Sequence, residues 1–290
     1  MQFKASIQLL MKNNGRLTAQ SIGVNRASTF AGFCHEHDSS TFAPIDQPIT
    51  TLTDEQIFLL AYRAICRELS TKTAASAERV LRTARQLDKG KDKAAQRVIQ
   101  DLNTYREMGL EAGLRDLRGQ KTEYDQVLLH KSYERMSYYI VTLDHAPPIV
   151  CTVGFPPEVD FHGTRLQKLD LTTRHLDTMT CSIIKVGGGA AIVFAWLSEK
   201  NGACSGLINS LEKIKVHQLP SSIVRLVFEH GENVFFSLTW WNGLDGTAKT
   251  TIERHANSIT DKAEDCLKPD ASVQVLWSVV GKKKVIRSVG

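Results

Sequence analysis

Apolar residues recur at helical spacing after residue 53 and predict a long helix there. The recurring positions are Ile57, Leu60, Ala61, Ala64, Ile65 and Leu69. Thr53 and Gln56 form a capping-box pattern, in which each side chain can bond the backbone of the other residue. Asp54 and Glu55 add negative charge to the first turn, where the helix dipole favours it. The helix is therefore predicted to begin at residue 53 or 54.

Three further amphipathic stretches predict helices over residues 74–87, 92–117 and 122–136. Asp88-Lys89-Gly90 forms a turn-like break between the first two. Gly109 and Gly113 are expected to weaken the end of the second, because glycine is a poor helix former. Four helices joined by short polar turns predict an antiparallel helical hairpin or bundle.

The pattern changes near Tyr138 to runs rich in β-branched and aromatic residues. These runs predict strands over residues 138–143, 149–153, 180–186, 190–197, 223–230, 233–238 and 273–280. Helices are predicted over 205–214 and 245–267. Gly187–Gly189 and His230–Glu232 are interpreted as hairpin turns. Most of the strands follow one another without long crossovers, which favours an antiparallel sheet.

The predicted fold class is therefore α+β. Residues 1–50 form an irregular segment, punctuated by Gly15, Gly23 and Gly32 and closed by Pro44 and Pro48. Residues 51–137 form the helical region. Residues 138–290 form a β-rich α+β domain with about two helices.

Composition narrows the class of protein without identifying it. The 290 residues are 42% hydrophobic and 23% charged, which is typical of a globular protein. The net charge of +5 permits contact with nucleic acid without requiring it. The longest apolar stretch, residues 190–197, is far shorter than the roughly 20 residues of a membrane span. We therefore predict a cytoplasmic protein with no membrane segment.

Six cysteines stand singly along the chain, and no two form a C-x-x-C pair: Cys34, Cys66, Cys151, Cys181, Cys204 and Cys266. A chain of this size does not need disulfides to fold, and a cytosolic compartment keeps thiols reduced. All six are predicted to be unpaired.

Candidate metal chemistry is concentrated between Phe33 and Phe42. Cys34 and His37 have a C-x2-H spacing that allows a thiolate and an imidazole to bind one ion, with His35 and Asp38 beside them. The expected ion is zinc or another divalent metal. Zinc takes about four ligands, and the usual second cysteine pair is absent. The alternative is a tight turn with a buried cysteine, in which the His and Asp side chains cap the backbone.

A resemblance extends this interpretation. The sequences GVNRASTF (residues 23–30), GFC (32–34), HD (37–38) and F-x-PID (42–46) resemble a segment of uncharacterised bacterial proteins with an HNH-like, zinc-knuckle front end. The opening FKASIQ (3–8) is similar to a strand that precedes this segment in those proteins. Looser similarity extends to residues 155–163, Glu232-Asn233 and Trp240-Trp241. The resemblance covers most of the chain but is specific only around residues 23–46.

The resemblance implies a metal-dependent nuclease with a catalytic histidine at position 5, together with His37 and Asp38. Here Ala5 occupies that position, and no cysteine pair precedes it. An HNH nuclease needs a histidine to activate water and a metal to hold the phosphate. Three explanations stay open: lost nuclease chemistry, a substituted histidine, or a misleading likeness. If residues 3–8 form a strand beside residues 33–38, Ala5 should face His37 or Asp38.

Basic residues on the second and third predicted helices are candidates for binding DNA or RNA. Arg82, Arg85, Lys89 and Lys93 could contact phosphates, and such binding would weaken as salt rises. The alternative is a solvated helix face, since acidic residues are interspersed with the basic ones.

Glu232, Asn233, Trp240 and Trp241 could line a polar pocket or stack on a base. Paired tryptophans near a strand end are more often part of a core. Arg225 and His230 have a spacing seen in some helical ribonucleases, but their run predicts a strand, in which that geometry fails.

Two functional hypotheses follow. The first is a metal-binding, nucleic-acid-associated protein that resembles an HNH-like nuclease with an incomplete motif, acting in bacterial antiviral defence. The second is a non-enzymatic interaction module, in which the helical hairpin binds a protein partner or a second copy of the chain.

Overall fold

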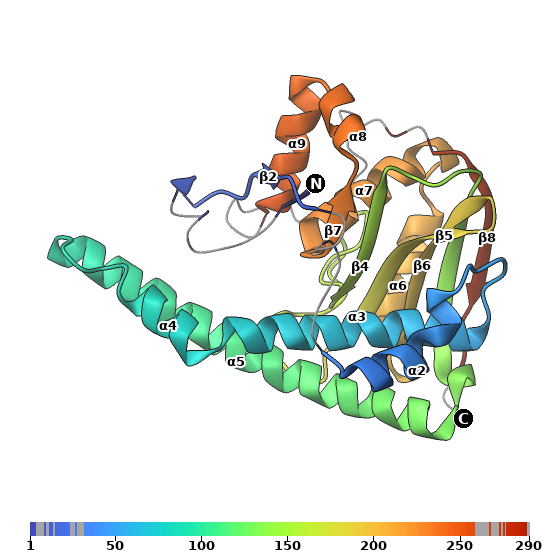
Figure 1. Ribbon diagram of the computed structural model, residues 1–290, viewed down its shortest axis with the longest axis horizontal. Coiled ribbons are helices and arrows are strands. Elements are labelled where there is room, and N and C mark those ends of the chain that lie inside the picture. The colour runs from blue at the N-terminus through green and yellow to red at the C-terminus, as the bar shows by residue number, and fades with distance from the viewer. Residues whose placement is uncertain are drawn as a thin grey trace.

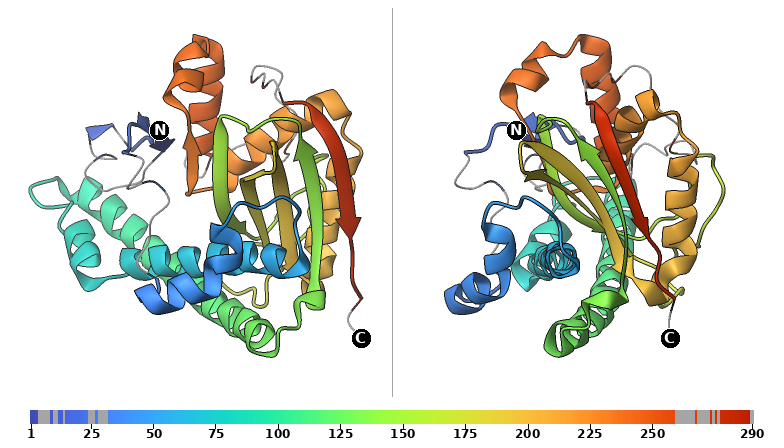
Figure 2. Two further views of the ribbon diagram at one scale, coloured as in Figure 1. Left: turned by 45° about the vertical axis from the view of Figure 1, so that its right-hand side comes forward. Right: turned by 90° about the vertical axis from the view of Figure 1, so that its right-hand side faces the viewer.

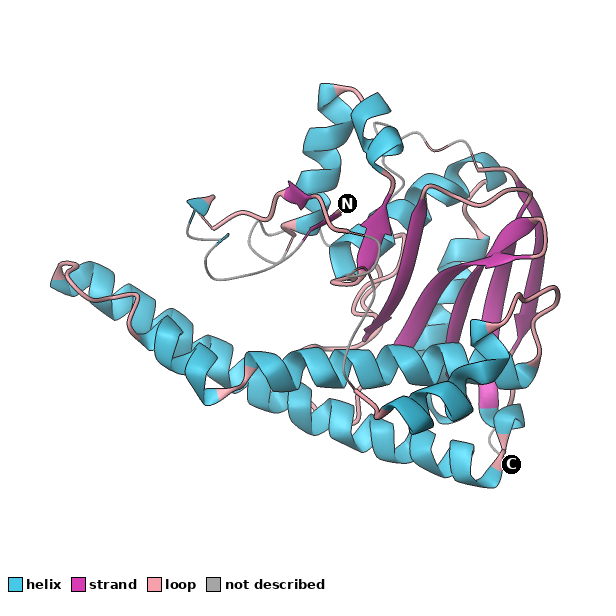
Figure 3. Cartoon of the chain, in the orientation of Figure 1, coloured by secondary structure: helices cyan, strands magenta, loops and turns pink. Residues whose placement is uncertain are grey.

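A computed structural model describes residues 1–3, 9, 12–13, 15–23, 27, 32–258, 267, 273, 275 and 277–288, without the side chains of residues 78 and 79. An eight-stranded antiparallel sheet stands between helices, and a long helical arm extends away from it (Figures 1 and 3). The predicted α+β class and the antiparallel sheet are confirmed.

The helices are α2 (His35–Asp46), α3 (Asp54–Ala75), α4 (Glu78–Arg85), α5 (Lys93–His130), α6 (Asn201–Glu212), α7 (Leu219–His230), α8 (Leu238–Gly243) and α9 (Gly246–Ala256). Short 3-10 helices are η2 (Tyr133–Arg135), η3 (Ser198–Lys200) and η4 (Val216–Gln218). The strands are β1 (Gln2–Phe3), β2 (Ala19–Gln20), β3 (Met136–Leu143), β4 (Ile149–Phe155), β5 (Met179–Val186), β6 (Gly189–Leu197), β7 (Val234–Phe236) and β8 (Val279–Val285).

The sheet order is β2-β1-β7-β4-β5-β6-β3-β8. The β5–β6 hairpin turns at Gly187, whose φ of +56° suits a residue without Cβ. The short β1 pairs with β7, so the beginning of the chain joins the sheet beside an element from near its end. An edge-on view shows helices covering both faces of this sheet (Figure 2).

The face covered by α3 contains one of two apolar cores. Phe58 is fully buried and stacks on Tyr62 and Tyr124, which joins α3 to α5. The predicted capping box starts α3: Thr53 Oγ1 accepts from Gln56 N at 3.2 Å, and Thr53 N donates to Gln56 Oε1 at 3.1 Å. These local signals explain why the sequence placed α3 correctly.

The opposite face of the sheet packs on α6 and α7. Phe194 and Trp196 of β6 are fully buried there with Leu207 of α6 and Ile223 of α7. Side chains alternate along β6 between this core and the α3 core, as the two-residue period of a strand requires.

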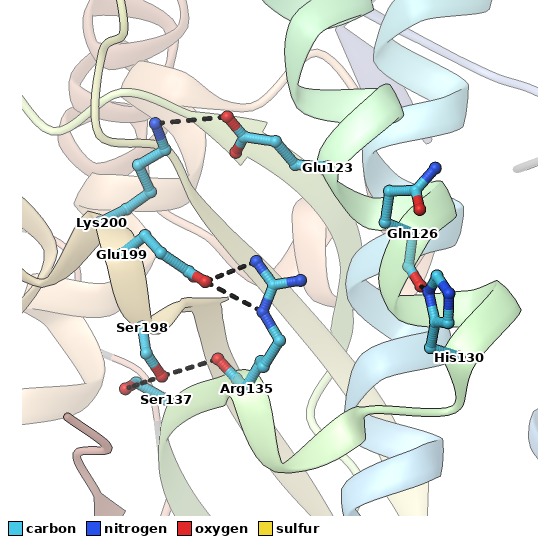
Figure 4. Close-up of polar contacts among 8 residues, drawn as sticks. All are labelled: Glu123, Gln126, His130, Arg135, Ser137, Ser198, Glu199 and Lys200. Atoms are coloured by element: carbon cyan, nitrogen blue, oxygen red, sulfur yellow. Dashed lines mark hydrogen bonds and ion pairs between the residues drawn. The ribbon is translucent and has the colours of Figure 1, made fainter. Parts of the chain in front are cut away.

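Polar contacts tie the end of α5 to the sheet (Figure 4). Arg135, just before β3, forms an ion pair with Glu199 after β6, and Ser198 Oγ donates to the Arg135 carbonyl at 2.6 Å. Glu123 of α5 lies 3.7 Å from Lys200 Nζ. These contacts connect the end of the helical region to the segments that flank β3 and β6.

Residues 223–230 belong to helix α7, so the predicted strand is wrong there. Nearly every residue from Leu219 to Phe228 is buried. The run taken as a strand is short and rich in β-branched residues (Ile223, Val224 and Val227), and its composition does not distinguish a helix from a buried strand. The predicted hairpin at residues 230–232 is also wrong, since this segment joins α7 to β7.

Other boundaries differ in a similar way. Residues 93–130 form one helix instead of two, and Gly113 lies against Lys72 of α3, where an added Cβ would be 3.2 Å from Lys72 Cδ. The packing of α5 on α3 therefore outweighs the low helix propensity of glycine. Residues 35–46 form α2 within the segment expected to be irregular, Leu238 begins α8, and β8 starts at Val279.

Candidate functional site

The predicted metal ligands lie at the exposed start of α2. Cys34 is the N-cap residue, and its Sγ is 3.1 Å from His37 Nδ1 in the first turn. Zinc at about 2.3 Å from sulfur and 2.0 Å from nitrogen would hold these two atoms roughly 3.6 Å apart. Within the described ranges, no group of three potential metal ligands is found. The observed arrangement is a hydrogen-bonded pair, and the alternative of a buried Cys34 is wrong.

Ala5 lies outside the described residues, as does most of the predicted strand 3–8. Phe3 is described, and it packs in the core against Phe236 and Trp241. The predicted approach of Ala5 to His37 or Asp38 therefore stays a prediction.

The five described cysteines are unpaired, and Cys266 lies outside the described residues. Cys34 is exposed, whereas burial raises the pKa of Cys66 to about 11 and raises the pKa values of Cys181 and Cys204. Of these five thiols, Cys34 should be alkylated first in the native protein, since the thiolate is the reactive form. Mass spectrometry of peptides after a short iodoacetamide pulse measures this order. Faster labelling of Cys66 or Cys204 would contradict it.

The predicted phosphate-binding residues lie along the arm formed by α4 and the first part of α5. Arg85 is paired with Glu107, with Nε–Oε1 and Nη2–Oε2 distances of 3.0 and 2.8 Å. Arg82, Lys89 and Lys93 are exposed. Much of the Arg85 charge is therefore already compensated within the arm.

The residues predicted to line a polar pocket lie in different surroundings: Glu232, Asn233, Trp240 and Trp241. The two indole rings pack on Phe236, with centroid separations of 5.8 and 5.2 Å. Glu232 lines cavities beside α3, whereas Asn233 lines a pocket between β4 and β7. The structure thus places Trp241 in the core with the partly exposed Trp240 beside it, and it directs Glu232 and Asn233 to different cavities.

A buried ionisable cluster surrounds Glu68 on α3. Its carboxylate accepts from the Gly154 backbone N–H, and Oε1 is 3.6 Å from Arg67 Nη1. Burial, and then the nearby Glu232 charge, raise the pKa of Glu68 to about 7 against the opposing charges of Arg67 and Lys72. Arg67 Nε and Nη1 and Glu68 Oε1 have no hydrogen-bond partner among the described residues.

A second buried network links α7 to α9. Glu229 Oε1 accepts from Arg225 Nε at 2.7 Å and from His255 Nδ1 at 3.0 Å. Burial opposes ionisation of Glu229, but the hydrogen bond from His255 and the charge of Arg225 outweigh it, so its pKa is lowered. The neighbouring His230 stacks on Phe155 at 4.8 Å, and burial lowers its pKa.

Arg225 and His230 lie on helix α7, so the expectation that both lie on a strand is wrong. They are five residues apart, about 140° around the helix, and Arg225 is engaged by Glu229.

Sequence reasoning missed Arg67 and Glu68, although one signal was available. Glu68 continues the apolar stripe of α3 one turn after Ala64 and Ile65. A carboxylate on the buried face of an otherwise amphipathic helix is uncommon and marks an ionisable site.

Comparison with known proteins returns no matching family model, curated protein or solved structure. Within the described part of the chain, no helix is both long and apolar enough to cross a membrane.

Proposed function

We propose that this chain is a non-enzymatic interaction module that pairs with a second copy of itself through its arm. The arm comprises α4 and residues 93–108 of α5, and it projects beyond the sheet (Figure 1). The observation that carries the proposal is the exposed apolar stripe on α5, where Val98, Leu102, Tyr105 and Met108 are 58%, 64%, 72% and 47% exposed.

In a helical hairpin that is stable by itself, the apolar sides of the two helices pack against each other. In the arm, the exposed apolar residues of α5 lie on the side away from α4. Three polar residues of α5 bond the α4 side: Asn103 donates to the Ala84 carbonyl, Gln100 bonds Asp88, and Glu107 pairs with Arg85. At 100° per residue, these three positions lie about half a turn around α5 from Val98. The apolar side of α5 thus faces away from α4, which indicates a partner outside the monomer.

The stripe fits a helix as its partner. Its residues repeat every three or four positions over about 15 Å, which matches one face of a second helix. A two-fold axis would bring the same rim of two arms together in an antiparallel pair. With the axis at the middle of the stripe, Val98 of one copy would lie opposite Met108 of the other.

Self-association tests this proposal directly. Sedimentation equilibrium should give twice the 32.3 kDa mass of one chain at micromolar concentrations. Leu102→Glu and Tyr105→Glu should each raise the dimer Kd at least tenfold, since burying a leucine contributes about 1.5–3 kcal/mol. Leu129→Glu is the matched control, because Leu129 is 74% exposed on the same helix outside the arm.

A charge swap separates a second copy from an unrelated partner. Val98→Glu alone should weaken dimerisation, and adding Met108→Lys should restore part of it, because each glutamate of one copy then lies opposite a lysine of the other. A wild-type protein that stays monomeric, or a dimer indifferent to all these changes, would overturn the proposal.

The metal-dependent nuclease stays the second candidate. The specific observation in its favour is that Cys34 and His37 lie on one exposed helical turn, where a shared zinc ion would need Sγ and Nδ1 only about 0.5 Å further apart. Elemental analysis should then find zinc or another divalent metal that is lost in Cys34→Ser. DNA or RNA binding through the arm should weaken in the Arg82→Glu, Arg85→Glu, Lys89→Glu triple variant. A protein free of metal and of nucleic-acid affinity would remove this candidate.

A further inference from the structure

The sheet has one long edge strand, β8. Among the described residues, β8 pairs only with β3, and Figure 2 shows it along the rim of the sheet. The opposite edge is the two-residue β2, which is too short to template another strand. The outer side of β8 presents backbone N–H and C=O groups along seven residues. Such an edge can accept an added strand from another chain.

Lysines project from β8 on both faces of the sheet. Cross-strand partners share a face. Lys282 lies opposite Val141, which belongs to the core on the α6 side. Lys283 lies opposite Ile140, which belongs to the core on the α3 side. Successive side chains of a strand added to this edge would therefore meet positive charge whichever face they occupy.

Two of the three consecutive lysines lack a counter-charge among the described residues. Lys284 Nζ lies 2.6 Å from Glu212 Oε2, so its charge is matched. Lys282 and Lys283 are exposed, and neither forms an ion pair with a described residue. Lys283 Nζ instead lies 5.3 Å from the centroid of the Tyr138 ring. The middle of the edge therefore carries positive charge that an anionic partner can neutralise.

This pattern favours an acidic partner over a second copy of the chain. Two β8 strands paired edge to edge would bring lysines close to lysines, and like charges across a strand pair are destabilising. An extended segment with consecutive acidic residues would instead place carboxylates beside Lys282 and Lys283. Val280 and Ile286, at the two ends of the lysines, are 62% and 43% exposed and could contact apolar residues that flank the acidic ones.

We propose that β8 binds an extended acidic segment of a partner protein as an additional strand of the sheet. Backbone hydrogen bonds to β8 hold the segment extended, and Lys282 and Lys283 select for consecutive acidic side chains. This edge shares no residue with the arm, so the proposal stands or falls independently of the proposed dimerisation.

The probe is the peptide Val-Thr-Glu-Glu-Glu-Thr-Val with fluorescein at its N-terminus. Fluorescence anisotropy should show saturable binding of one peptide per chain, and the affinity should fall as salt rises. N-methylation of the three glutamates keeps their charges but removes three backbone donors, and it should weaken binding at least tenfold. Equal binding of the two peptides would show that the lysines attract anions without strand addition and would overturn the proposal. Absence of binding by the unmethylated peptide would also overturn it.

Protein variants test the selection for acidic side chains. Lys282→Glu and Lys283→Glu should each weaken peptide binding about fivefold, because an attraction across the strand pair becomes a repulsion. Lys185→Glu is the matched control, since Lys185 is an exposed lysine of β5, three strands in from this edge. The reversed peptide Val-Thr-Lys-Lys-Lys-Thr-Val should bind the folded double variant better than it binds the wild type. Equal losses in all three single variants, or no loss in any, would overturn the proposal.

Discussion

Replacing Glu229 by glutamine is expected to lower the free energy of unfolding by about 3–5 kcal/mol. Glu229 Oε1 accepts from both Arg225 and His255, and all three side chains are nearly buried. Glutamine keeps the shape of the side chain but removes its negative charge. The buried Arg225 guanidinium would then lose the counter-charge that this network supplies, and removing one partner of a buried pair is costly. Urea denaturation measures the change.

The matched control is Glu212→Gln. Glu212 Oε2 lies 2.6 Å from Lys284 Nζ, but this pair is partly exposed, so its loss should change stability by about 0–1 kcal/mol. Equal effects in the two variants would show that the α7–α9 network contributes no more than a surface pair.

Glu68 alone should lower stability by about 3 kcal/mol as pH rises from about 4.5 through 7. Folding raises the pKa of this carboxyl from 4.5 to about 7, so the folded state holds the proton more tightly than the unfolded state. The favourable contribution is complete at low pH and is lost as the unfolded chain, and then the folded chain, releases the proton. Above pH 7 the ionised Glu68 penalises folding.

Glu68→Gln should remove this pH dependence, since glutamine can still accept from the Gly154 N–H but does not titrate. The variant should be more stable than the wild type at pH 8 and similar to it at pH 4.5. Glu111→Gln, an exposed site on α5, is the control and should leave the wild-type profile intact. A Glu68→Gln profile parallel to that of the wild type would contradict the assignment.

The sequence predicted correctly those elements that begin or end at a local signal, such as a capping box or a glycine turn. Thr53 and Gln56 fixed the start of α3, and the three glycines after Val186 fixed the β5–β6 turn. Segment α7 was missed because its apolar run is short and rich in β-branched residues, which is also the composition of a buried strand. Gly109 and Gly113 were expected to weaken the helix, but α5 continues through both. Its packing on α3 outweighs the low helix propensity of glycine.

The candidate sites were less accessible to sequence reasoning. Asn233 was singled out, but its hydrogen bond to the Thr152 carbonyl exists only because the fold places β7 beside β4. The arm was predicted as a basic hairpin, whereas its exposed stripe depends on which side of α5 faces α4. Charges can be counted from a sequence, but the direction in which a helix face points is decided by its neighbours.

The pairing of β1 with β7 constrains the order of assembly during synthesis. Met1 and Phe236 exchange backbone hydrogen bonds although 235 positions separate them. At about 5–20 residues per second, β1 leaves the ribosome on the order of 10–50 s before its partner. The strands from β3 to β6 can pair early with one another, whereas the edge of β4 that receives β7 stays open from the synthesis of β4 until that of β7. The nascent chain thus carries an unpaired strand edge until residues 234–236 have left the ribosome.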